Sequence, residues 1–159
     1  MVEWAALKSR MASLQYSIDI AAPVHTVWTT MLGDETYRDW TSAFGEGGYF
    51  EGDWSEGSTI RFVGQEDDGS LSGMIGTVVA NRPDKFVSVE YFGQIIHGEI
   101  DTTSDDAQAF VGSYENYSFE ETDGVTRVTV ELSDDEMMNQ FDDVWPRALG
   151  RLKELAENR

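Results

Sequence analysis

The residues best suited to chemistry in this sequence are two histidines and a few carboxylates inside apolar segments. His97 and Glu99 are two positions apart, so their side chains share one face if the segment is extended. A carboxylate that orients an imidazole would make a general base of this pair. The alternative is that both are solvated loop residues, because no third partner completes a catalytic set. His25 falls beside the apolar stripe of a predicted helix, and we expect it to point outward.

Glu115 is the second candidate for proton transfer. It interrupts an apolar strand pattern and shares the parity of Tyr117 and Phe119. If it points inward, it needs a partner such as Arg61 or a tyrosine hydroxyl, because an unpaired buried carboxylate is costly. Perturbed acids of this kind are typical of functional sites. Exposure near the end of the strand is the competing interpretation, and it is the one we favour.

The sequence contains no motif for cysteine chemistry, metal binding or cofactor binding. The chain has no cysteine, which excludes disulfides, thiolate catalysis and cysteine-bound zinc. The acidic runs at 66–68 and 105–106 lack the ligand spacing of a calcium loop, so we interpret them as solvated turns and expect no metal. The fifteen glycines form no phosphate-binding or dinucleotide fingerprint, and we expect no cofactor.

The charge of the chain argues against two classes of partner. Its formal net charge is −19, from 30 acidic and 11 basic residues. Nucleic acids and anionic membrane surfaces both require a face rich in Lys and Arg, so we expect neither. No run approaches the length of a membrane span and residues 1–13 do not read as a secretory signal, which predicts a cytoplasmic protein. We interpret the acidity as a solvated surface; an acidic docking patch is the alternative.

Most of the chain has the alternating pattern of strands. Residues 14–20 alternate apolar and polar side chains, and Asp123 with Gly124 gives a strong hairpin signal. In 125–132 we expect every second side chain, from Thr126 to Leu132, to be buried. Pro23 begins a short helix that Gly33 ends, and a second short helix follows within 35–40. Six further strands are predicted, at 48–54, 58–63, 71–81, 86–94, 112–121 and 125–132.

The last segment, 133–159, predicts one long amphipathic helix. Ser133 and Glu136 stand at the spacing of a capping box. Apolar residues recur at three- and four-residue steps and form one buried stripe. Pro146 lies inside this helix, where it would remove one backbone hydrogen bond at a cost of about 3 kcal/mol, and we expect a kink there.

A surplus of aromatic and methionine side chains predicts an adaptable apolar cavity between this helix and the sheet. The alternative is that these side chains simply fill the core. The residues predicted to bind a ligand are Phe62, Met74, Tyr91, Tyr117, Phe119, Met137, Met138, Phe141 and Trp145.

Several short stretches, in this order, resemble one known family. They are Ile20, Ala22, Pro23, Val27 and Trp28; 37–40; Gly73, Gly76, Val78, Arg82, Pro83 and Phe86; Tyr117, Phe119, Gly124, Thr126 and Arg127; and Trp145, Pro146, Leu149 and Leu152. The chain resembles the START-like (SRPBCC) superfamily and, within it, the homologues of the activator of the heat shock protein 90 ATPase. The eukaryotic activators place this module beside a domain that contacts the chaperone. Only a short tail precedes Leu14 here, so we do not expect direct activation of the chaperone.

The resemblance implies an α+β helix-grip fold. In this fold a curved antiparallel sheet of six to seven strands wraps around a long C-terminal helix, with two short helices after the first strand and a cavity between helix and sheet. It implies no shared catalytic residues. We expect a single domain over 14–159, with 1–13 as an N-terminal extension.

Three functions are open at this point. We expect a monomeric, non-enzymatic module that binds a small hydrophobic or amphipathic ligand, such as a lipid or polyketide, in the cavity. One alternative is a cyclase- or hydratase-type enzyme that uses Glu115 or His97 in the same cavity. The other is a protein that interacts with a chaperone or another partner through its acidic surface.

Overall fold

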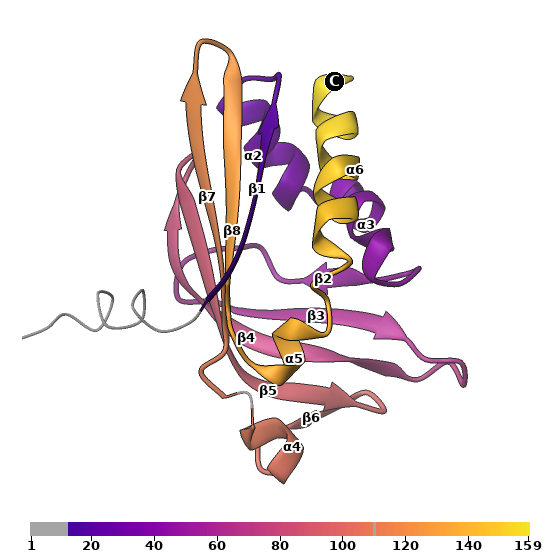
Figure 1. Cartoon of the computed structure of the whole chain (residues 1–159). Helices are drawn as coiled ribbons and strands as arrows, with labels where there is room; N and C mark the ends of the chain where they lie inside the picture. Colours follow the sequence, from indigo (N-terminus) through magenta and orange to yellow (C-terminus); the bar gives the residue numbers. More distant parts are fainter. Residues whose placement is uncertain (1–12, 110) are drawn as a thin grey trace, which may run out of the picture.

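An antiparallel sheet forms the body of the protein and curves around three helices (Figure 1). The computed structural model describes residues 13–109 and 111–159, and these contain eight strands in one sheet. The strand order is β1-β8-β7-β5-β4-β3-β2, and β6 pairs with β5 beside this path. The strands are β1 (Ser13–Ile20), β2 (Tyr49–Glu51), β3 (Thr59–Gln65), β4 (Leu71–Arg82), β5 (Phe86–Ile96), β6 (Glu99–Asp101), β7 (Tyr114–Thr122) and β8 (Val125–Ser133).

Each of the seven predicted strands overlaps a strand of the structure. The alternation in β8 is confirmed: its buried residues are Thr126, Val128, Val130 and Leu132. Strand β6 lies outside the predicted strands. The tail predicted for 1–13 lies outside the described residues, except for Ser13, which begins β1.

The helices lie mainly on the concave side of the sheet (Figure 1). Helices α2 (Val24–Leu32) and α3 (Asp34–Trp40) follow β1, as predicted, and a 3-10 turn, η1 (Thr41–Phe44), extends α3. The remaining helices are α4 (Asp105–Gln108), α5 (Glu136–Asn139) and α6 (Trp145–Glu157). None of the described helices is long and apolar enough to cross a membrane.

The C-terminal segment differs from the single helix predicted for 133–159. Strand β8 continues to Ser133, whose hydroxyl donates to the Asp135 carboxylate at 2.8 Å instead of capping a helix. Asp135 is the residue that caps α5: its side chain accepts from the backbone N–H of Met138 at 2.9 Å. Helix α5 ends after one turn, and turns lead from it to α6.

Pro146 has a different role from the expected kink. It lies in the first turn of α6, where its missing N–H would have had no helical partner. The proline therefore begins a helix and does not bend one. Beyond it, α6 buries a stripe made of Trp145, Ala148, Leu149, Leu152 and Ala156.

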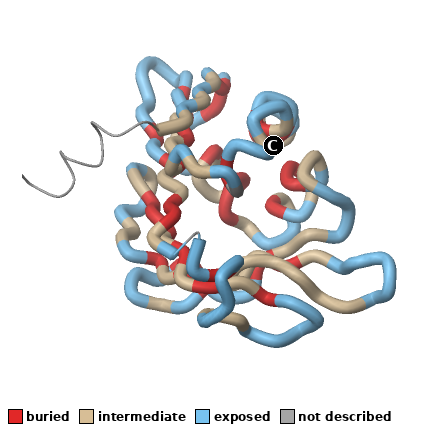
Figure 2. Tube along the Cα trace, turned by 60° about the horizontal axis from the view of Figure 1, so that its bottom comes forward, coloured by how far each residue is buried: buried red, intermediate tan, exposed pale blue. Residues whose placement is uncertain are grey.

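The main apolar core fills the space between the sheet and helices α2, α3 and α6. Figure 2 shows buried positions where strands and helices face one another, and exposed positions along the outer loops. The pairing of β4 with β5 shifts register at Ile75/Gly76 and again at Val78/Ala80. Such bulges increase the twist and bend of a sheet, and these two help to curve it around the helices.

Candidate ligand-binding cavity

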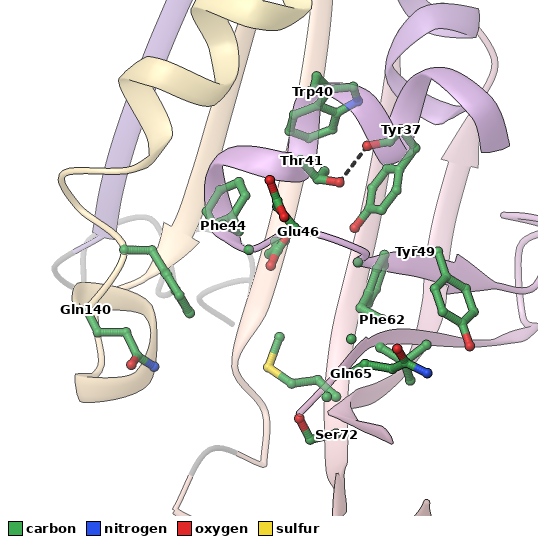
Figure 3. Close-up of a pocket in the computed structure, with 18 of the residues that line it drawn as sticks. Tyr37, Trp40, Thr41, Phe44, Glu46, Tyr49, Phe62, Gln65, Ser72 and Gln140 are labelled. Carbon is green, nitrogen blue, oxygen red and sulfur yellow. Dashed lines mark hydrogen bonds between the residues drawn. The ribbon is translucent and has the colours of Figure 1, made fainter. Parts of the chain in front are cut away.

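A cavity of about 490 Å³ lies between the sheet, the α3–η1 segment and the chain that leads from α5 into α6 (Figure 3). This volume is within the usual range of small-molecule sites. The walls are largely aromatic. Tyr37, Trp40 and Phe44 come from α3 and η1, Phe62, Tyr91 and Tyr117 from the sheet, and Phe141 and Trp145 from the C-terminal segment.

A carboxylate and two tyrosine hydroxyls meet on the sheet side of the cavity. The Tyr91 hydroxyl donates to Glu115 Oε1 at 2.8 Å, and the Tyr117 hydroxyl donates to Oε2 at 2.7 Å. Strands β5 and β7 bring them together: Glu115 pairs with Val89, and Tyr91 is the diagonal neighbour two residues further along β5. Both tyrosines are buried, whereas Glu115 is only half-buried and lines the cavity. A ligand in the cavity can therefore reach the carboxylate.

Burial and mutual charge shift the acidity of this cluster. Burial raises the pKa of Glu115, and the hydrogen bonds from Tyr117 and Tyr91 partly oppose that change. Burial, followed by the nearby charge of Glu115, holds the pKa values of Tyr37, Tyr91 and Tyr117 well above their usual range. The tyrosines are thus neutral hydrogen-bond donors at ordinary pH, and Glu115 is the group that can exchange a proton.

The structure corrects the interpretation that Glu115 is exposed near a strand end. It lies on the same inner face of β7 as Tyr117, as the alternation along the strand predicts. There its two oxygens accept hydrogen bonds from the hydroxyls of Tyr117 and of Tyr91 on the neighbouring strand. Of the two partners considered, the tyrosine hydroxyl is the one found. Arg61 precedes Phe62 in β3 and does not line the cavity.

Most of the residues predicted to bind a ligand line this cavity. They are Phe62, Met74, Tyr91, Tyr117, Met138, Phe141 and Trp145. Phe119 does not line it: its ring packs edge-on against Trp28 of α2, with 5.0 Å between ring centroids. The side chain of Met137 lies outside the described part of the chain.

The histidines do not line the cavity, which argues against the alternative that His97 acts inside it. His97 stands in the turn between β5 and β6 with φ +50°, so it does not share an extended face with Glu99. It is exposed, and its Nδ1 is 3.3 Å from the Ser70 hydroxyl. His25 is also exposed, with Nδ1 3.0 Å from Asp84. Of the two candidates for proton transfer, only Glu115 lines the cavity.

Three wall residues on α3 and η1 were not predicted as site residues. Tyr37, Trp40 and Phe44 are three and four positions apart, which is the spacing of one helical face, and this is the signal that could have identified them. The Trp40 indole N–H donates to the Met31 carbonyl at 3.0 Å, so the buried ring has its polar atom satisfied. Phe44 packs edge-on against Trp145, with ring centroids 4.9 Å apart, and joins the two sides of the wall.

The mouth of the cavity is polar. Exposed Glu46, Gln65 and Gln140 lie around it (Figure 3). Exposed Glu66 also lines it and accepts a hydrogen bond from the Ser72 hydroxyl. Within 13–109 and 111–159, no group of three or more potential ligands could hold a metal ion.

Comparison with known proteins places the chain in a family. A sequence model described as activator of Hsp90 ATPase homolog 1-like protein matches residues 21–157, nearly the whole described chain. The chain belongs to this family. None of the curated proteins compared with the sequence matches it.

Several solved structures share the fold of this chain. A protein from Mesorhizobium loti is 17% identical, with a TM-score of 0.66, and the match covers 92% of this chain and 98% of that one. The Aha1 dimer from Colwellia psychrerythraea is 18% identical with a TM-score of 0.66, covering 92% and 97%. A protein of the dynemicin biosynthetic locus is 15% identical with a TM-score of 0.61, covering 91% of this chain and 47% of that one. At these identities the likeness concerns the helix-grip fold alone.

Proposed function

We propose that this protein is a binding module for a small hydrophobic or amphipathic molecule held between α6 and the sheet. The observation that carries the proposal is a cavity of about 490 Å³ with aromatic walls and a hydrogen-bonded Glu115–tyrosine cluster on one side. Aromatic walls provide the apolar contact that holds a ligand, and a few convergent polar groups orient it. The family and the fold are consistent with this role.

The wall combines rigid and adaptable parts. The Trp40 and Tyr91 side chains are almost completely buried, at 1% exposure each, and are held by hydrogen bonds to Met31 and Glu115. Met74 and Met138 also line the cavity, and unbranched methionine side chains adjust to irregular shapes. Such a wall can accommodate several related ligands of slightly different shape.

The neutral fluorescent probe N-phenyl-1-naphthylamine tests the proposal directly. We expect its emission to rise on addition of the protein, and the indole N–H signals of Trp40 and Trp145 to shift in NMR spectra. Trp28 lies outside the cavity and is the internal control. Absence of any emission change, or shifts centred on Trp28, would contradict the proposal.

Two matched variants locate the binding. Met74→Trp places a large ring in the cavity, whereas Val79→Trp places the same ring on an exposed position of the same strand. We expect the first variant to lose probe binding and the second to keep it. Equal binding by both variants would place the probe elsewhere on the protein.

An enzyme that transfers protons within the same cavity is the second candidate. Glu115 favours it, because this carboxyl has a raised pKa, faces the cavity and lies between two tyrosine hydroxyls. A carboxyl with a pKa closer to neutrality is a better general acid or base. Glu115→Gln should abolish turnover of any substrate found, and unchanged turnover would exclude this role.

A further inference from the structure

We propose that the cavity selects ligands that carry a positive charge, namely an ammonium or similar organic cation attached to an apolar body. This inference rests on the proposed binding function and names the class of ligand. Three features support it independently: the acid at the sheet side, the aromatic walls and the charges around the mouth.

Glu115 supplies the counter-ion. Each of its oxygens accepts one tyrosine hydrogen bond, at 2.8 and 2.7 Å, which leaves further lone pairs on both atoms. The two bonds fix the direction of the carboxylate without neutralising its charge. Because the side chain lines the cavity, a cationic group placed there would form a charge-assisted hydrogen bond or a close ion pair.

The walls favour a cation for a second reason. Aromatic faces carry negative partial charge and attract a cation whose centre lies within about 6 Å of the ring. Tyr91 and Tyr117 flank Glu115, and Tyr37, Trp40 and Trp145 also line the cavity. A cation near Glu115 therefore lies in a cavity whose walls carry several aromatic rings, and its apolar body packs against them.

The charges around the cavity have one sign. Glu46 and Glu66 lie at its mouth, and no Lys, Arg or His belongs to the described lining. Arg38 lies against a wall residue: its guanidinium is 4.7 Å from the centre of the Tyr49 ring and pairs with Asp34 at 3.3 Å. It is thus paired and does not itself line the cavity. A carboxylate ligand would bring a second negative charge to Glu115 without a counter-ion.

A neutral alcohol is the strongest competitor, because its hydroxyl could also donate to Glu115. Three probes with one apolar body separate these cases: 4-phenylbutylamine, 4-phenylbutan-1-ol and 4-phenylbutanoate. Dissociation constants would be measured by titration at pH 7 in about 0.15 M salt, which shortens the screening length to about 8 Å and reduces general attraction to the acidic surface. The Trp40 and Trp145 indole signals report whether each probe enters the cavity.

We expect the amine to bind at least about tenfold more tightly than the alcohol, and the carboxylate to bind most weakly. Equal or tighter binding of the alcohol or the carboxylate would overturn the charge preference while leaving the binding function intact. Failure of all three probes, and of N-phenyl-1-naphthylamine, to shift the cavity signals would contradict the binding function itself. The two failures are therefore distinguishable.

A pair of variants assigns the preference to Glu115. Glu115→Gln should weaken amine binding about tenfold or more and change alcohol binding by less than about threefold. Glu99→Gln removes the same formal charge from an exposed position in β6 and should change neither. Equal loss of amine binding in both variants, or no loss in either, would overturn the assignment. The order of the three probes on the unaltered protein tests the preference even if Glu115→Gln does not fold.

Discussion

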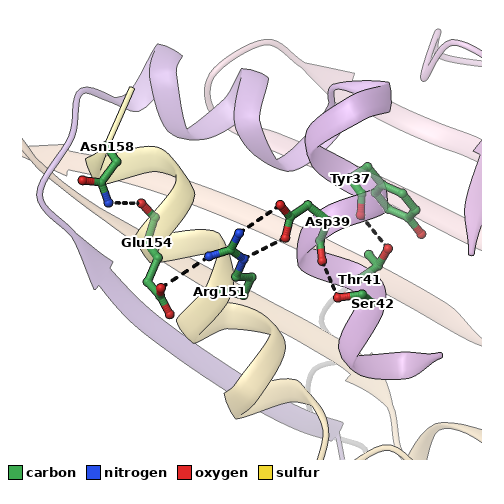
Figure 4. Close-up of polar contacts among 7 residues, drawn as sticks. All are labelled: Tyr37, Asp39, Thr41, Ser42, Arg151, Glu154 and Asn158. Carbon is green, nitrogen blue, oxygen red and sulfur yellow. Dashed lines mark hydrogen bonds and ion pairs between the residues drawn. The ribbon is translucent and has the colours of Figure 1, made fainter. Parts of the chain in front are cut away.

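Arg151 of α6 forms a two-point ion pair with Asp39 of α3 (Figure 4). The guanidinium Nε lies 2.7 Å from Asp39 Oδ1, and Nη2 lies 3.0 Å from Oδ2. A second contact, 3.4 Å from Nη1 to Glu154, holds the guanidinium from the side of its own helix. Because Trp40 follows Asp39 directly and Trp145 begins α6, this pair ties together the two helices that carry both wall tryptophans.

We expect Arg151→Ala to lower the melting temperature by no more than about 3 °C, because partly exposed ion pairs contribute little to stability. The hydrogen bond from Arg151 lowers the pKa of Asp39, so the stabilisation is present at neutral pH and is lost as pH falls through that lowered pKa. Arg147→Ala, at an exposed position of the same helix, is the control. Thermal unfolding at several pH values checks this prediction. A difference in melting temperature between the two variants that grows as the pH falls would contradict it.

Glu115 should give the opposite dependence on pH. Burial raises its pKa from the ordinary 4.5, so the folded protein holds the proton more tightly than the unfolded chain does. Between those two pKa values, the contribution of Glu115 to the free energy of unfolding therefore falls as pH rises. Urea unfolding of the unaltered protein and of Glu115→Gln isolates this term. We expect the wild type to lose stability relative to the variant as pH rises above 4.5. A constant difference would show that the pKa of Glu115 is not raised in the folded protein.

Gly73 is required where β3 and β4 approach each other. A Cβ atom built on it would lie 1.8 Å from the Phe62 carbonyl oxygen, a backbone atom that cannot move aside without separating the strands. We expect Gly73→Ala to lower the free energy of unfolding by about 1–3 kcal/mol or more. A Cβ on Gly64, also in this strand pair and also lining the cavity, meets nothing within 4 Å. Chemical denaturation should show a change of less than about 0.5 kcal/mol for Gly64→Ala.

The acidic composition predicts a response to salt. With 30 acidic and 11 basic residues, repulsion between exposed carboxylates outweighs the few surface ion pairs. Raising sodium chloride from about 0.02 M to 0.15 M shortens the screening length to about 8 Å and weakens that repulsion. We expect the melting temperature measured by circular dichroism to rise. A flat or falling melting temperature would mean that the ion pairs dominate.

The strands were predictable because their signals are local. Asp123 and Gly124 both have positive φ, +51° and +82°, as the hairpin turn between β7 and β8 requires. In β8, burial alternates at every second residue, so the period of two placed Thr126 and Val128 on the correct face. Neither feature depends on what the rest of the chain does.

The C-terminal helix was predicted, but its start was placed too early because a non-local contact competes with a local pattern. Ser133 and Glu136 do have capping-box spacing, but Ser133 pairs with Ser13 at the end of the β1–β8 ladder. That pairing keeps Ser133 in the sheet, so the residue that caps the following helix is Asp135. Pro146 was recognised as a break in helical hydrogen bonding, yet its position at a helix start depends on where the preceding turns end.

The site was predictable only in part for the same reason. Parity along one strand placed Glu115 with Tyr117, because both belong to β7. The second donor, Tyr91, depends on the register between β5 and β7, which the sequence alone does not specify. Tyr37 likewise reaches the cavity only through the way α3 packs against the sheet.

The short helix α5 and the turns around it form a part of the cavity wall that belongs to no strand and to no long helix. Residues 134–144 carry Met138, Gln140 and Phe141 into the wall, and they are bounded by β8 on one side and α6 on the other. None of these residues belongs to a strand, and Tyr16 of β1 donates a hydrogen bond to Asp142 within the stretch at 2.5 Å. The cavity wall thus has two parts of different kinds: the sheet supplies Glu115 from a hydrogen-bonded strand, and residues 134–144 supply side chains from a helical turn and loops.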